Sequence, residues 1–294
     1  MGAWPAVDGA VISPPGGLID SHVHIWDAAD PGSEWLRGQV ELPARVGIAE
    51  LVEAMTSTLE AAVLVEAASS TITTHKMLAA ARLAPWPVRV IGWIDLARPG
   101  VADRLSALLD ADESGALAGV RATLGIDADP GRLDEALTAL AERNLVAEVL
   151  LGRRQLPMLV EFVRKHPAVP IVVDHLAALA DVGTDTAPWI RALDELSMLP
   201  NAVIKVSGWR SIAPDRMEWA VTQLTQRIGA ERLMFGSDWP MSARFGPHSE
   251  TVAATRELLA RALSDAQLAE VFAGTAQRVY GFPSRAETLR EGTH

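Results

Sequence analysis

The chain has 294 residues, of which 49% are hydrophobic and 21% charged, so it can form a large core and is not disordered. Its net charge is −11 and its lysines and arginines form no run, which argues against nucleic acid or an anionic membrane as a partner. The absence of cysteine excludes disulfides and thiolate metal sites, and no apolar stretch approaches the roughly 20 residues that span a bilayer.

Residues 1–17 form an irregular leader rich in proline and glycine. The leader lacks the basic and long apolar regions of a signal peptide, so we expect a cytoplasmic protein. No linker rich in proline, glycine or serine divides the rest of the chain. We therefore predict a single domain over residues 1–294, a length that suits one α/β barrel.

Eight short runs rich in valine and isoleucine recur along the chain. They lie at Leu18–Trp26, Ala61–Ala67, Val88–Leu96, Leu117–Leu124, Leu145–Leu151, Pro170–Leu176, Asn201–Ser207 and Arg232–Trp239. Their apolar residues are continuous rather than alternating, which is typical of strands buried on both faces of a parallel sheet.

The segments between these runs carry helix signals. Asp129 and Pro130 offer an N-cap and a first helical residue, and Ser264 offers another N-cap. Leu105 and Leu108 fall on one face of a further helix. Eight strands, each followed by a helix, predict an α/β fold of the (β/α)8 TIM-barrel type.

Two histidines, His22 and His24, stand at i and i+2 on the first predicted strand. Side chains at this spacing point the same way, about 6–7 Å apart. Imidazoles among isoleucine, valine and tryptophan side chains need a partner if they are buried. Alone, the pair indicates either a metal or reacting-oxygen site, or a pair that is simply solvated or hydrogen-bonded.

In such barrels the active site lies at the carboxyl ends of the strands, where the loops converge. Besides the histidine pair, the polar residues predicted there are Glu66, Asp95, Arg121, Glu148, Asp174, His175, Lys205, Ser207, Ser237 and Asp238, flanked by Trp26, Trp93, Trp209 and Trp239. We place all three histidines of this group within strands. Asp174, which precedes His175, is then expected to point to the opposite face.

Several of these charges need partners. Asp238 ends a buried strand, so its carboxylate requires a positive charge, a metal or hydrogen bonds. Arg121 requires an anion, which is either Glu148 on the neighbouring strand or a carbonyl or carboxylate of the substrate. Lys205 presents the same choice, with a salt bridge inside the barrel favoured. For His248, in the loop after the last strand, capping or solvent exposure is favoured over a place at the mouth.

The sequence resembles the amidohydrolase superfamily in four residues: His22 and His24 on the first predicted strand, His175 on the sixth and Asp238 on the eighth. Within it, the chain is similar to the amidohydrolase-2 family of sugar-acid lactonases, which act on L-fucono-, L-rhamnono- and galactono-lactones and are related to 2-pyrone-4,6-dicarboxylate lactonase. The phrases that carry the resemblance are IDSHVHIWD (19–27), VIGWIDL (90–96), GVR (119–121), QLP (155–157), VVDHLA (172–177), NAVIKVSG (201–208), ERLMFGSDWP (231–240) and AQRVYGF (276–282). They cover nearly the whole chain in order.

The resemblance implies an enzyme that opens the ring of a small lactone, with a sugar-acid (aldono-) lactone as its expected substrate. Water would attack the carbonyl with Asp238 as general base, while His175 and Arg121 stabilise the developing negative charge. The residues assigned to substrate binding are Trp26, Glu66, Lys205, Trp239 and His248. One divalent metal, Zn²⁺ by preference, would be held by His22, His24 and Asp238, with Glu148 or His175 completing the site. Otherwise the enzyme would use no cofactor, and His22 and His24 would donate directly to the carbonyl.

Departures from the family pattern narrow these expectations. Arg121 and Glu148 stand where binuclear members typically have a bridging lysine or glutamate and a histidine, so a two-metal site is not expected. Glu66 stands where glutamine is commoner. Because this position lies near the mouth of the barrel, the resemblance does not identify which lactone is the substrate. The alternatives are a metal-dependent decarboxylase or amide hydrolase of the same superfamily, and an inactive barrel that serves as a scaffold. The sequence leaves open whether the chain forms a homo-oligomer.

Overall fold

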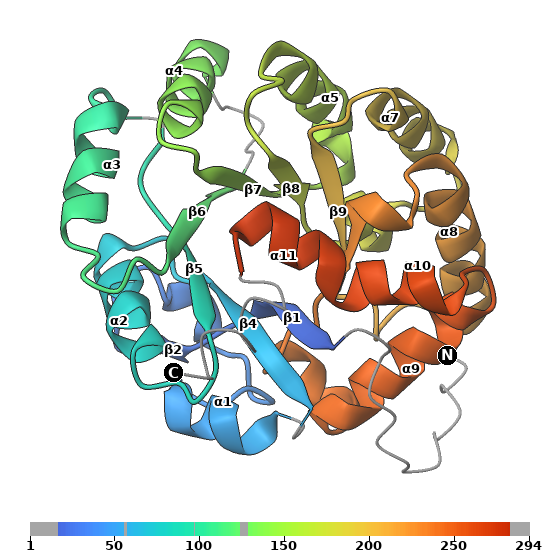
Figure 1. Ribbon diagram of the computed structural model, residues 1–294, viewed down its shortest axis with the longest axis horizontal. Helices are drawn as coiled ribbons and strands as arrows, with labels where there is room; N and C mark the ends of the chain where they lie inside the picture. Colours follow the sequence, from blue (N-terminus) through green and yellow to red (C-terminus); the bar gives the residue numbers. More distant parts are fainter. Residues whose placement is uncertain (1–16, 56–57, 97, 124–128, 283–294) are drawn as a thin grey trace, which may run out of the picture.

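The computed structural model describes residues 17–55, 58–96, 98–123 and 129–282 (Figure 1). Residues 1–16 of the expected leader lie outside the described residues. Among the described residues, no helix has the length and apolarity that crossing a membrane requires.

Eight parallel strands form one sheet that curls into a barrel (Figure 1). In order around the barrel they are β1 (Leu18–Val23), β4 (Leu59–Val65), β5 (Val88–Gly92), β6 (Leu117–Thr123), β7 (Val146–Leu150), β8 (Ile171–Val173), β9 (Ala202–Val206) and β10 (Leu233–Phe235). A separate antiparallel pair, β2 (Trp26–Asp27) and β3 (Arg45–Val46), lies in the loop after β1. All eight predicted strands, and the TIM-barrel fold, are confirmed.

A ring of helices surrounds the strands (Figure 1). The helices are α1 (Ile48–Ala54), α2 (Thr71–Ala81), α3 (Val101–Asp110), α4 (Pro130–Ala141), α5 (Leu156–Lys165), α6 (His175–Ala178), α7 (Ala187–Ser197), α8 (Pro214–Arg227), α9 (His248–Ala260), α10 (Asp265–Ala269) and α11 (Thr275–Tyr280). Single turns of other helix types lie at Glu34–Leu36, Arg153–Gln155, Leu179–Asp181, Ala230–Arg232, Met241–Phe245 and Glu270–Gly274.

The predicted helix starts are confirmed by their hydrogen bonds. The carboxylate of Asp129 accepts from the backbone N–H of Gly131 at 2.9 Å, and α4 begins at the next residue, Pro130. The hydroxyl of Ser264 accepts from the backbone N–H of Gln267 at the start of α10. Each cap satisfies a backbone N–H that has no partner within its own helix.

The strands separate two apolar layers, which explains why their sequences do not alternate. One layer fills the space between strands and helices; the other fills the barrel interior and includes Ile19, Val63, Val172 and Met234. Tyr280 packs with the inner layer, so α11 covers one end of the barrel (Figure 1). The opposite end, where the strands terminate, stays open for the site.

The barrel closes between β1 and the residues that follow β10. Val23 pairs with Trp239 in a parallel bridge, the backbone N–H of Asp238 donates to the carbonyl of His22 at 2.8 Å, and that of His24 donates to the carbonyl of Trp239 at 2.8 Å. Closure therefore brings the histidine pair beside Asp238.

The strands end earlier than the sequence predicts. β1 ends at Val23, β8 at Val173 and β10 at Phe235. His24, His175 and Asp238 therefore lie just beyond their strands, and the prediction that all three histidines lie within strands holds only for His22. Backbone beyond a strand end need not follow the alternation of the sheet, so these side chains can be aimed individually.

Candidate active site

A cavity of about 340 Å³ opens at the carboxyl ends of the strands. Its lining residues are His24, Trp35, Glu66, Ala67, Ser69, Trp93, Arg121, Leu150, His175, Asp238 and Met241. They come from the ends of seven of the eight strands and the loops that follow, as expected for a barrel of this type.

Asp238 lies against both histidines of the first strand. Its Oδ1 is 3.3 Å from Nε2 of His24 and 3.7 Å from Nε2 of His22. The Nδ1 of His24 lies 2.7 Å from the carbonyl of Val65. A carbonyl only accepts, so this nitrogen carries a proton, and Nε2 is the ring atom that faces the Asp238 carboxylate.

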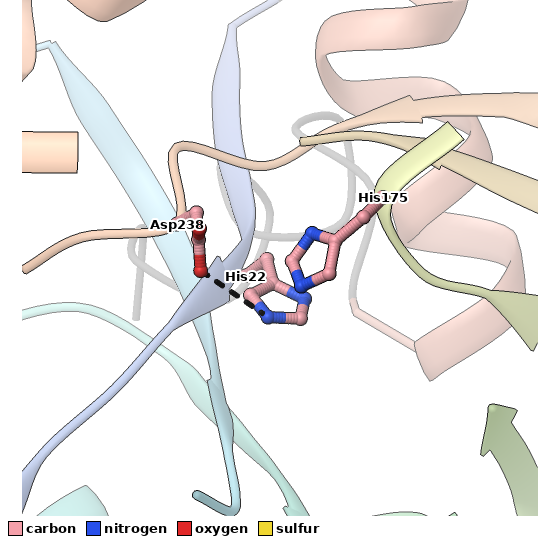
Figure 2. Close-up of side chains that lie close together, drawn as sticks. All are labelled: His22, His175 and Asp238. Atoms are coloured by element: carbon pink, nitrogen blue, oxygen red, sulfur yellow. Dashed lines mark ion pairs between the residues drawn. The ribbon is translucent and has the colours of Figure 1, made fainter. Parts of the chain in front are cut away.

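His175 reaches the same point from the other side of the cavity. Figure 2 shows it beside His22, with the Asp238 carboxylate on the far side of the His22 ring. The ring centroids of His22 and His175 are 4.7 Å apart. The Nδ1 of His175 is 3.0 Å from the hydroxyl of Ser207, which orients the ring.

The backbone at His175 is left-handed, with φ 51°, and the following residues through Ala178 share this conformation. Gly208, whose own φ is 64°, lies against the His175 ring: a Cβ there would come within 2.5 Å of Nδ1. Position 208 therefore requires glycine for both its conformation and its space. This turn, rather than the strand, aims His175 into the cavity.

His22 is held from beneath by buried charges. Its Nδ1 lies 3.2 Å from Oδ1 of Asp174, 3.2 Å from Nζ of Lys205 and 3.6 Å from Oε1 of Glu148. All of these side chains are fully buried. Nδ1 thus has both an acceptor and a donor within reach. If Nδ1 donates to Asp174, Nε2 of a neutral His22 carries a lone pair; if Nδ1 accepts from Lys205, Nε2 carries the proton. The surroundings therefore support both tautomers.

The carboxylate of Asp174 also pairs with Arg121. The Nε and Nη2 of Arg121 donate to Oδ2 of Asp174 at 3.1 and 2.9 Å, and Nη1 donates to the carbonyl of Glu66 at 2.9 Å. The expectation that Asp174 points away from the site is wrong. β8 ends one residue earlier, so the alternation with His175 does not apply.

Glu148 binds Lys205 rather than Arg121. Its Oε1 is 2.6 Å from Nζ of Lys205, and its Oε2 accepts from the hydroxyl of Tyr280 at 2.9 Å. Arg121 and Glu148 are register partners on adjacent strands, but the nearer Asp174 takes the guanidinium. The salt bridge favoured for Lys205 is confirmed.

The environment shifts the pKa values of these groups in different directions. Burial lowers the pKa of His22 well below its ordinary range, although Asp174 opposes this shift. Burial, reinforced by the Asp174 carboxylate, raises the pKa of Glu148 to about 7. Burial alone would raise the pKa of Asp238, but His175 and a hydrogen bond from His24 lower it to about 2. Asp238 is therefore ionised at neutral pH.

One side-chain group has the spacing of a metal site. His22, His175 and Asp238 each offer a ligand atom, and these atoms lie within 4.8 Å of one another. The Nε2 of His22 is buried and has no hydrogen-bond partner, as expected of an atom that waits for an ion or a substrate. Two imidazoles and a carboxylate suit a single ion of the Zn²⁺ type.

A second group with metal-like spacing, His22, Glu148 and Asp174, already surrounds the ammonium of Lys205. The prediction that Glu148 is a metal ligand does not agree with this geometry. Glu148 lies at Nδ1 of His22, whereas Asp238 lies at Nε2 on the opposite edge of the ring. His175, the alternative to Glu148 as the completing ligand, belongs to the candidate ligand set, whereas His24 belongs to neither group.

The sequence matches the family model described as Amidohydrolase over residues 19–282. The chain belongs to the amidohydrolase family. The resemblance inferred from its motifs is confirmed, and the match spans the described barrel from β1 through α11.

Two curated relatives of this amidohydrolase are named L-fucono-1,5-lactonase. The one from Burkholderia multivorans is 31% identical over 292 residues and covers 92% of this chain and 97% of the relative. The one from Burkholderia ambifaria is 28% identical over 277 residues, covering 89% of this chain and 94% of the relative.

Solved structures agree with the fold. An amidohydrolase from Burkholderia multivorans with bound zinc has a TM-score of 0.79 at 30% identity and covers 90% of this chain and 99% of its own. A probable 2-pyrone-4,6-dicarboxylic acid hydrolase from Acinetobacter baumannii, with citric acid bound, has a TM-score of 0.72 at 17% identity and covers 90% of this chain and 100% of its own. At that identity the second likeness shows the fold alone.

Among the residues assigned to substrate binding, Glu66 is the one that lines the cavity of this amidohydrolase. Its carboxylate is already engaged, because it accepts from the backbone N–H groups of Ala68 and Ser69 at 2.6 and 2.9 Å and from the hydroxyl of Thr73 at 2.8 Å. Glu66 thus fixes the conformation of the loop before α2. In this loop, the backbone of Ser69 is left-handed.

The other four residues assigned to substrate binding lie outside the cavity lining. Lys205 is fully buried beneath His22, and His248 is buried with its Nε2 2.9 Å from Asp20. Trp26 donates to the carbonyl of Pro43 and lines a separate cavity, and Trp239 is buried. Direct substrate contact does not fit these placements.

Five lining residues were not singled out in the sequence: Trp35, Ala67, Ser69, Leu150 and Met241. Trp35 and Met241 lie in irregular loops, where no periodicity marks a side chain as facing a cavity. Asp20 was also missed, although its spacing of two from His22 places it on the same face of β1.

The buried Lys205–Glu148 ion pair is expected to contribute to the stability of the fold. We expect Lys205→Met to lower the free energy of unfolding by about 3–5 kcal/mol, because it leaves the Glu148 carboxylate buried and unpaired. The matched control is Lys76→Met, which removes an ammonium paired with Asp30 at the surface and should cost less than about 1 kcal/mol. Urea unfolding of both variants measures the difference; equal losses would contradict the prediction.

Proposed function

We propose that this amidohydrolase hydrolyses the ring ester of a sugar-acid lactone. The observation that carries the proposal is the ionised Asp238, held between His24 and His22 at the mouth of the barrel and facing a cavity of about 340 Å³. The two curated relatives named L-fucono-1,5-lactonase, at 28% and 31% identity, support this reaction class.

In the proposed reaction, Asp238 accepts a proton from water as the water oxygen bonds to the lactone carbonyl carbon. The ring C–O bond then breaks, and Asp238 returns the proton to the leaving ring oxygen. The product is the open-chain hydroxy acid. His24, whose Nε2 lies 3.3 Å from Asp238, keeps the carboxylate facing the cavity.

Arg121 and His175 stabilise the negative charge that develops on the carbonyl oxygen. Both line the cavity, and Asp174 fixes the Arg121 guanidinium by two hydrogen bonds, so little reorganisation is needed when the charge appears. His22, His175 and Asp238 would be the ligands of one divalent ion, Zn²⁺ by preference, and the ion would then take over the role of His175 at the carbonyl oxygen. Such an ion would polarise the carbonyl and acidify its water.

The charges of the cavity favour a neutral lactone over a dicarboxylate one. Among the lining residues described, Arg121 is the one arginine or lysine, and Asp174 and the Glu66 carbonyl occupy three of its N–H groups. A substrate with two carboxylates would therefore have only the two remaining N–H groups of Arg121 as cationic donors, and it would meet the Asp238 carboxylate. The tryptophan walls, Trp35 and Trp93, suit the C–H faces of a sugar ring.

A lactone panel tests the proposed function. We expect purified protein to release acid from L-aldono-1,5-lactones well above the enzyme-free rate. Its kcat/KM for 2-pyrone-4,6-dicarboxylate should be at least about 100-fold lower, because the cavity offers too few cationic donors for two carboxylates. Acid release with a pH indicator is the measurement. Turnover of amides, or CO₂ release from β-keto acids or hydroxybenzoates, without lactone hydrolysis would refute the assignment.

The role of Asp238 predicts a specific loss. We expect Asp238→Asn to lower kcat for the best lactone by about 100-fold or more, because the amide cannot accept the proton of water. The control is Asp27→Asn, which changes a carboxylate outside the catalytic cavity that can still accept from the backbone N–H of Ala29. Undiminished hydrolysis by Asp238→Asn would rule out the general-base role.

The proposed metal site predicts one bound ion. In calorimetric titrations of chelator-treated protein, we expect Zn²⁺ to bind with a stoichiometry of one. His22→Ala and His175→Ala should each weaken binding at least about tenfold. His75→Ala, which removes an exposed imidazole of α2, should match the wild type. Unchanged affinity in both site variants would place the ion elsewhere.

A further inference from the structure

Asp20 is a fully buried carboxylate beside the site that does not line the cavity. Its Oδ1 accepts from the backbone N–H of His22 at 3.1 Å and from that of Ser237 at 2.8 Å. Its Oδ2 lies 2.9 Å from Nε2 of His248, which is also fully buried. The proposed reaction uses neither side chain, so the position of this pair needs an explanation.

The pair lies where three elements meet. Asp20 belongs to β1, Ser237 to the loop after β10, and His248 is the first residue of α9. Through its two oxygens, Asp20 therefore joins the first strand of the barrel to the last loop and to the helix that follows it. Ser237 is the residue immediately before Asp238.

The backbone of Asp238 requires support of this kind. Its φ is 62°, a left-handed conformation that residues other than glycine rarely adopt. The peptide is held on both sides: Asp238 donates its N–H to the carbonyl of His22, and its own carbonyl accepts from the N–H of Ser242 at 2.9 Å. The Ser237 N–H bond to Asp20 fixes the residue just before this turn.

We infer that Asp20 and His248 are positioning residues that hold the Asp238 carboxylate in its catalytic place; the inference rests on the proposed function. Asp20 anchors the Ser237 peptide, and His248 fixes the orientation of the Asp20 carboxylate. Small displacements of a general base cost much of the rate while leaving substrate binding nearly intact.

Ser21 provides a matched control for a merely structural role. It is fully buried on the same strand, and its hydroxyl donates to the carbonyl of Phe235 in β10 at 2.6 Å. Ser21→Ala thus removes a buried bond between the same two parts of the chain, but one that does not involve the Ser237–Asp238 turn.

Steady-state kinetics on the best lactone test the inference. Asp20→Ala is expected to lower kcat by about 100-fold with KM within about threefold, and His248→Ala to lower kcat by about tenfold. Asp20→Asn should recover most of the loss, because its side-chain carbonyl still accepts from Ser237. Ser21→Ala should keep kcat within about threefold of the wild type. If Asp20→Ala does not fold, His248→Ala decides, and unchanged kcat there overturns the inference.

A double-mutant cycle separates positioning from general loss of structure. In the Asp238→Asn background, adding Asp20→Ala should lower the remaining kcat by less than about threefold, because the group that it positions is already gone. Losses that multiply in full would overturn the inference.

A readout without activity distinguishes failure of the inference from failure of the proposed function. In a crystal structure of Asp20→Ala, or of His248→Ala if the former does not fold, the Asp238 carboxylate should move away from Nε2 of His24, which lies 3.3 Å away in the wild type. An unmoved carboxylate would overturn the inference even if no lactone is turned over.

Discussion

Closure of the barrel between its first and last strands is the constraint on which the site depends. β1 supplies His22 and His24, while Asp238 follows β10, and these segments meet only where the sheet joins itself. The backbone hydrogen bonds of the seam run between the same residues that carry the proposed chemistry. The hydrogen bonds of the seam therefore fix how His22, His24 and Asp238 lie relative to one another. A barrel without this seam would retain its strands and lose its site.

Beneath the seam, the buried ion pairs Lys205–Glu148 and Arg121–Asp174 have two effects: they neutralise each other's charges, and they limit where a cation could bind. Burying an ion is unfavourable unless it is paired, and here Lys205 and Arg121 offset Glu148 and Asp174. The ammonium of Lys205 also occupies the position that a cation would take below His22. An ion in the proposed site would therefore be held by Nε2 of His22, the ring nitrogen on the Asp238 side.

Much of the fold and part of the site could be predicted from the sequence. Strand positions, helix caps and the grouping of His22, His24, His175 and Asp238 follow from apolar runs and from the rule that loops converge at strand ends. The partners of the charges could not be predicted, because they depend on where each strand stops. Asp174 lies in the site because β8 ends at Val173. Glu66 caps its loop because the backbone N–H groups of Ala68, Ser69 and Ser70 donate to its carboxylate.

The contact between Tyr280 and Glu148 ties the floor of the site to the last described helix, α11. The ribosome makes β1 early and α11 late, so the hydroxyl that completes the Glu148 environment is among the last parts of the barrel to be synthesised. A nascent chain in which all eight strands have been synthesised still lacks Tyr280, the partner of Glu148. The floor of the site therefore cannot be complete before α11 has been synthesised.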